Sequence, residues 1–163
     1  MKKILLTILI AVIAVTGINV SATSTIKIDK KTYIHTGSRK EAKFHTTKGY
    51  AYCITPHRTG AGQGTSLSYK SRKTNGGVLY LLDNTGTSDS DYLATQLAIW
   101  IYDSNYLPDF YKNHSGYSVV KKAKTLANKA KKNSNYKGKQ PSIKIVTSSS
   151  NLSETSDGNY YKS

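Results

Sequence analysis

Cys53 is the only cysteine in a chain of 163 residues whose first residues have the pattern of a secretory leader. In the leader, two lysines at positions 2 and 3 precede an almost entirely apolar run over residues 4–15, and small residues follow at 20–22. This pattern predicts a signal peptide over residues 1–22, because the run is shorter than the roughly 20 residues that span a bilayer. An exported chain with one cysteine cannot be held by internal disulfides, so it must bury an apolar core.

The remaining chain is long enough for one domain, and its 37% hydrophobic residues are sufficient for a core. We expect that domain over residues 23–147. Residues 148–163 are expected to form a linker or the start of a following β domain that the given sequence cuts short. After leader removal no segment is apolar enough for a membrane span, so we expect a secreted or cell-surface protein.

Periodicity predicts both strands and helices in the mature chain. Residues 92–102 follow a polar cluster rich in helix-capping residues, and they are expected to form a mostly buried helix. Residues 118–132 combine an apolar stripe with six lysines, which indicates an amphipathic helix. Residues 78–82 fit either a buried strand or a short helix. Strands are expected over 25–34, 49–55, 66–70 and 143–147, with a loop at 60–64 and a turn entering a last strand over 156–163.

Two short segments carry residue types that suit covalent chemistry. Tyr52 and Cys53 precede an isoleucine in a predicted strand, and the predicted helix contains the sequence Thr-Gln-Leu-Ala-Ile-Trp over residues 95–100. Both segments resemble, in order and residue for residue, the paired motifs of thioester domains on Gram-positive surface proteins and pilus-tip adhesins. In that family the cysteine is bonded to the glutamine of the helix. The resemblance implies a Cys53–Gln96 thioester, with Tyr52, Thr95, Ile99 and Trp100 as supporting positions.

The same resemblance implies an α+β fold, with a β-sandwich or barrel-like core and a helical subdomain carrying Gln96. It also implies covalent adhesion, in which a lysine amine of a host or surface protein attacks the Gln96 carbonyl and releases the Cys53 thiol. This capture occurs once per molecule, so the protein is not expected to be an enzyme. Attachment to the cell wall or a pilus, through a region outside the given sequence, is implied in the same way.

Physical chemistry explains why these residue types are needed. A glutamine amide becomes an acyl donor only where a thiolate attacks it and donors stabilise the oxyanion. Water would hydrolyse the product, and we expect the aromatic residues beside the motifs to exclude it. These residues are Tyr50, Tyr52, Trp100 and Tyr102.

Three alternatives stay open at this point. In the first, the cross-link forms but is only a structural staple, worth about 4 kcal/mol by loop entropy. In the second, the cross-link is absent and the protein is a non-covalent protein- or glycan-binding module. In the third, Cys53 is the nucleophile of a hydrolase with a histidine base, for which the candidates are His35, His45, His57 and His114.

The formal net charge of +15 invites an anionic partner. No helix-turn-helix or other nucleic-acid motif accompanies the charge, so no nucleic-acid partner is expected. The lysine-rich helix over residues 118–132 is a candidate for steering the protein toward an anionic surface. The histidines and acidic residues show no metal-ligand spacing, and we expect neither a metal nor a cofactor.

Overall fold

The computed structural model describes residues 26–47, 49–54, 56, 62–73, 75–137, 143–147 and 159–162. The predicted signal peptide, His57 and residues 60 and 61 of the predicted loop at 60–64 lie outside the described residues, whereas residues 62–64 are described and lie in no helix or strand. Within the part that is described, no helix has the length and apolar character needed to cross a membrane.

The strands form antiparallel pairs throughout. They hydrogen-bond in the order β1-β2-β3-β6-β5-β4, and the first residues of β1 also pair with β4. The strands expected near residues 25–34, 49–55, 66–70 and 143–147 are confirmed. The strands are β1 (Ile26–Thr36), β2 (Arg39–Thr46), β3 (Gly49–Cys53), β4 (Ser66–Lys73), β5 (Ile143–Thr147) and β6 (Asn159–Lys162).

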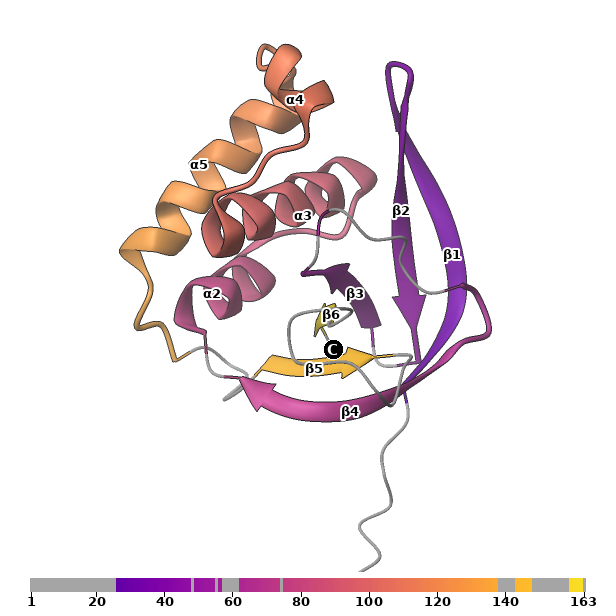
Figure 1. The fold of residues 1–163 in the computed structure, drawn as a ribbon. Coiled ribbons are helices and arrows are strands. Elements are labelled where there is room, and N and C mark those ends of the chain that lie inside the picture. The colour runs from indigo at the N-terminus through magenta and orange to yellow at the C-terminus, as the bar shows by residue number, and fades with distance from the viewer. Residues whose placement is uncertain are drawn as a thin grey trace, which may run out of the picture.

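Strand β2 has no counterpart among the sequence predictions. Half of its eight residues are charged, and Phe44 is its only large apolar residue. It forms because it pairs along β1 from Thr36 back to Lys30, with Arg39 opposite Thr36. Gly37 begins the two-residue turn between them with φ +58°, a conformation that favours glycine. The long β1–β2 hairpin rises beside the helices (Figure 1).

The helices gather on one side of the strands, with α3 between the β1–β2 hairpin and α5 (Figure 1). Residues 78–82 are helical, within α2. Helix α3 begins three residues before the predicted start, after Ser88, whose hydroxyl oxygen accepts a hydrogen bond from the Asp91 N–H at 3.1 Å. The five-residue α4 was not predicted, whereas α5 has its predicted bounds. The helices are α2 (Gly76–Asn84), α3 (Asp89–Ser104), α4 (Asp109–Asn113) and α5 (Ser118–Lys132).

The main core lies where α2, α3 and α5 meet, and it extends to Tyr52 of β3 and Ile34 of β1. The apolar stripe of α5 is buried as the sequence predicts, while its lysines are exposed. A smaller cluster of Ile26, Ile28, Phe44 and Ala51 lies among the strands. These two cores, one helical and one within the strands, establish the mixed α+β class.

The predicted domain boundary at residue 147 stays a prediction, since residues 148–158 lie outside the described residues. Residues 159–162, assigned from the sequence to a linker or a following domain, form β6 here. This strand pairs with β3 along its length, and Asn159 lies opposite Cys53. Strand β3 is therefore held on both edges, by β2 and by β6.

Candidate functional site

One face of α3 carries polar and aromatic side chains that bind the backbone of β3. Tyr92, Gln96 and Trp100 are spaced by four residues, so they lie above one another on the helix. The Tyr92 hydroxyl donates to the Ala51 carbonyl oxygen at 2.6 Å, and the Trp100 indole N–H donates to the Cys53 carbonyl oxygen at 2.8 Å. Gln96 lies between them. The regular helical spacing thus fixes α3 against the end of β3.

Gln96 and Cys53 are in direct contact. The Cys53 backbone N–H donates to Gln96 Oε1 at 2.8 Å, and Gln96 Nε2 donates to the Cys53 carbonyl oxygen at 2.7 Å. These two bonds fix which side of the carboxamide is oxygen and which is nitrogen. They also hold the amide carbon beside the residue that carries the thiol. The structure therefore brings together the two residues that the motifs paired.

The environment of this contact is dry on the helix side and partly open at the cysteine. Gln96 is 4% exposed and Trp100 is 5% exposed, whereas Cys53 is half-buried at the end of its strand. A carboxamide in such a site keeps its hydrogen bonds free from competition by water. The arrangement combines a shielded carboxamide with a thiol-bearing residue closer to the surface.

The other supporting positions fall into two groups. Tyr52 is fully buried and stacks on Tyr92, with ring centroids 4.6 Å apart. Its hydroxyl has no hydrogen-bond partner among the described residues, and burial raises the pKa of Tyr52 well above its ordinary value. Thr95 and Ile99 are also fully buried, and the Thr95 hydroxyl donates to the Asp91 carbonyl oxygen of its own helix at 2.8 Å. Thr95 and Ile99 support the helix core.

One of the aromatic residues expected to exclude water, Tyr102, lies elsewhere than predicted. Tyr102 packs on Gly77 at the start of α2, so closely that a Cβ on Gly77 would lie 2.2 Å from its ring. Tyr50 of β3 is half-buried, and its ring lies 4.8 Å from the ring of His45 and 6.0 Å from the ring of Tyr92 on α3. Of the four expected residues, three lie at the α3–β3 contact, namely Tyr50, Tyr52 and Trp100.

Sequence reasoning missed the role of Tyr92. Its hydroxyl also accepts a hydrogen bond from the Phe44 N–H at 3.3 Å, so one side chain joins α3 to β2 and β3. Burial is the main cause that raises the pKa of Tyr92, and negative charge at Cys53 raises it further. Tyr92 thus remains a neutral donor close to the cysteine. The sequence signal that could have identified Tyr92 is its position one helical turn before Gln96.

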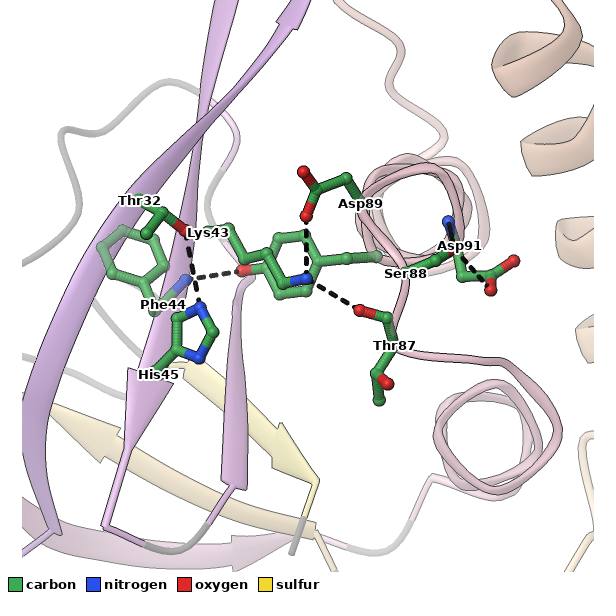
Figure 2. Close-up of polar contacts among 9 residues, drawn as sticks. Thr32, Lys43, Phe44, His45, Thr87, Ser88, Asp89 and Asp91 are labelled. Atoms are coloured by element: carbon green, nitrogen blue, oxygen red, sulfur yellow. Dashed lines mark hydrogen bonds and ion pairs between the residues drawn. The ribbon is translucent and has the colours of Figure 1, made fainter.

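A buried lysine fixes the beginning of α3. Lys43 of β2 is 5% exposed, and its Nζ donates to the Thr87 carbonyl oxygen at 2.7 Å and to Asp89 Oδ1 at 3.0 Å (Figure 2). The same Nζ lies 4.8 Å from the Tyr50 ring centroid. Nothing in the sequence distinguished Lys43 from the exposed lysines of the strand. Its contacts position the helix that carries Gln96.

The described histidines lie on separate elements. His45 Nε2 is 3.4 Å from the Thr32 hydroxyl (Figure 2), and burial lowers the pKa of His45, with nearby Lys43 and Lys30 acting in the same direction. His35 is exposed on β1. His114 Nδ1 is 2.7 Å from the Phe110 carbonyl oxygen, so that nitrogen is the donor. The described part of the chain holds no group of three metal-ligating side chains.

Comparisons of the chain with protein-family models, with curated proteins and with solved structures give no significant match. The functional argument therefore depends on the two motifs and on the geometry of the α3–β3 contact.

Proposed function

We propose that the protein is a secreted adhesin domain in which Cys53 and Gln96 form an internal thioester that captures an amine of a surface ligand. The observation that carries this proposal is the reciprocal pair of hydrogen bonds between the Gln96 carboxamide and the Cys53 backbone. Gln96 is 4% exposed, and a buried amide needs only one such partner for each of its polar atoms. Here both partners belong to the cysteine.

The two hydrogen bonds at the Gln96 amide support the proposed course of thioester formation. The Cys53 sulfur attacks the Gln96 side-chain carbonyl carbon, and negative charge develops on Oε1. The Cys53 N–H, 2.8 Å from Oε1, is a donor placed where that charge forms. The C–N bond then breaks and the nitrogen leaves as ammonia, with the proton from the thiol. Nε2 already points to the Cys53 carbonyl oxygen, which accepts from it as it leaves.

In ligand capture the Cys53 sulfur is the leaving group, whereas in thioester formation it is the attacking group. A lysine amine of the ligand attacks the same carbonyl carbon, an amide bond forms, and the Cys53 sulfur departs and takes up the proton. The Cys53 N–H again stabilises the oxyanion. The cysteine is half-buried, so the amine is expected to approach from the Cys53 side. The protein is consumed in the process, which makes it a single-turnover binder and not an enzyme.

The ring of strands suits a barrel-like core in this proposal. Strand β3 lies between β2 and β6, and β4 pairs with both β5 and β1. A closed ring would hold the Cys53 end of β3 rigidly against α3. Display on the cell surface, by wall or pilus attachment outside the given sequence, belongs to the same proposal.

Helix α5 is the proposed contact with an anionic surface. Its apolar stripe is buried against α2 and α3, and no acidic residue interrupts its exposed lysines. Lys122 is engaged with Asp91, which leaves the others facing solvent. Such a face would accelerate the approach to an acidic ligand, and the effect would weaken with salt.

Intact mass of the purified secreted chain tests the thioester. The expected mass is one ammonia below the sequence mass, and methylamine should add once. Cys53→Ala and Gln96→Glu should both have their full calculated masses and take up no methylamine. Full mass and no uptake in wild type would favour the non-covalent binding module, whereas turnover of a peptide or ester substrate that depends on Cys53 would favour the hydrolase.

A further inference from the structure

A cavity lies away from Cys53 and Gln96. It has a volume of about 550 Å³ and is bounded by the end of β1, the first turn of α3 and the first turn of α5. This volume is in the range of small-molecule sites. Neither Cys53 nor Gln96 lines it, so any ligand here would be held independently of the proposed thioester.

Two tyrosines distinguish this cavity from a packing gap. Tyr33 is 47% exposed and Tyr117 is 36% exposed, and they are the exposed large apolar side chains among the described residues. Both line the same cavity. The Tyr117 ring is ordered by His114 and Phe110, with ring centroids 5.0 Å and 6.3 Å away. A solvent-facing aromatic ring held in place is a stacking surface for an apolar ligand face.

The polar groups of the cavity are also fixed in position. Asp89 is bound through Oδ1 to the buried Lys43, which restricts its carboxylate although the side chain is largely exposed. Ser90 and Ser118 add hydroxyl groups. Helix α5 begins at Ser118 without a side-chain cap from Tyr117; the Val120 and Lys121 N–H groups donate to the Tyr117 carbonyl oxygen, and the Ser118 and Val119 N–H groups are further donors. The wall thus offers both acceptors and donors.

The charges and polar groups of the cavity lining indicate which class of ligand the cavity fits. Lys43 neutralises the Asp89 carboxylate, so this group favours neither an anion nor a cation as the ligand. An apolar ligand would give the Ser90 and Ser118 hydroxyls no hydrogen-bond partner. A neutral ring with several hydroxyl groups and an apolar face satisfies all of these features. We infer that this cavity binds a neutral saccharide, and it would serve as a non-covalent recognition site beside the covalent one.

Heteronuclear NMR titration of the secreted chain tests this inference. The probes are cellobiose, maltotriose, lactose and chitotriose, with a heparin disaccharide and lysine methyl ester as charged comparisons. At least one neutral sugar should shift the amide resonances of residues 33–36, 89–93 and 117–119 with saturable binding. Absence of binding by all four neutral sugars, or stronger binding by either charged probe at these residues, would overturn the inference.

Two variants and a matched control locate the site. Tyr117→Ala removes the stacking ring, and Ser90→Trp fills the cavity from an exposed position of α3. Each should weaken sugar binding at least tenfold. Tyr136→Ala, which changes a tyrosine at a different cavity beside Gly76, should leave binding unchanged. Equal weakening in all three variants, or in none, would contradict the assignment. Methylamine uptake should be unaffected in every case, which separates this inference from the thioester.

Discussion

Gln96 and Cys53 form a reciprocal hydrogen-bonded pair, in which the side chain of one holds the backbone N–H and carbonyl oxygen of the other. The pair joins the middle of α3 to the end of β3. The same two bonds that orient the amide also supply the oxyanion donor, so structure and proposed chemistry depend on one contact.

The first prediction concerns the indole of Trp100. Trp100→Phe keeps an aromatic ring but loses the hydrogen bond to the Cys53 carbonyl oxygen, now 2.8 Å. We expect a loss of about 1 kcal/mol in the free energy of unfolding. The thioester should form more slowly, measured as the fraction of molecules lacking ammonia against time after refolding. A variant that matches wild type in both measurements would show that this bond does not position Cys53.

Cleavage of the proposed thioester should destabilise the fold. Methylamine opens the loop between Cys53 and Gln96 without changing the sequence. The chain-entropy model gives a loss of about 4 kcal/mol, measured by urea denaturation of treated and untreated protein. Cys53→Ala treated in the same way is the control and should not change. Equal stability of treated and untreated wild type would rule out the structural staple.

Lys43 should contribute more to stability than the exposed lysines of its strand. Lys43→Met keeps the length of the side chain but loses the bonds to Thr87 and Asp89. The remaining Asp89 is mostly exposed and can be hydrated, so we expect a moderate loss of about 1–2 kcal/mol. Lys40→Met, at an exposed position of β2, should cost less than half as much in the same urea titration. Equal costs would mean that the Lys43 anchor contributes nothing.

His45 should make stability depend on pH in the weakly acidic range. Burial lowers its pKa in the folded state below the ordinary value of 6.5. The unfolded chain therefore binds a proton first as the pH falls, and stability present above pH 6.5 is lost as the pH drops through the folded pKa. Unfolding midpoints at several pH values should show this slope in wild type and less of it in His45→Gln. His35→Gln, on an exposed site, should keep the full slope.

Gly77 is required where α2 and α3 touch. A Cβ there would lie 2.2 Å from the Tyr102 ring, so Gly77→Ala forces the ring or the helix to move. We expect a loss of roughly 1–3 kcal/mol, the usual cost of overpacking. Gly116→Ala is the matched control, because a Cβ on Gly116 meets no atom within 4 Å. Thermal unfolding of both variants decides the matter, and similar melting temperatures would refute the requirement.

Much of the fold follows from local sequence patterns. The apolar stripe of α5 and the capping residues before α3 determine where those helices lie, and both act within a few residues of the chain. Strand β2 was not predicted, because the contacts that bury its residues come from segments distant in the sequence. Lys43 is inside the protein only because its charge meets Asp89 and the Thr87 carbonyl oxygen, and sequence periodicity contains no information about that pairing.

The candidate site was predictable in its residues but not in its geometry. The two motifs identified Cys53 and Gln96, and the helical spacing placed Tyr92 on the same side as Gln96. The hydrogen bonds to the backbone of β3 depend on the tertiary position of a strand, which no local pattern specifies. The same limit applies to Tyr102, whose ring turns to α2 because glycine leaves room there.

The pairing of β3 with β6 has a consequence for the timing of assembly. The segment that borders Cys53 on its second edge emerges from the ribosome and the export channel long after the cysteine itself. Until it arrives, the cysteine strand has one open edge and the amide on α3 has no rigid partner. Activation would thus be delayed until β6 itself has been exported, which would protect the bond from amines inside the cell.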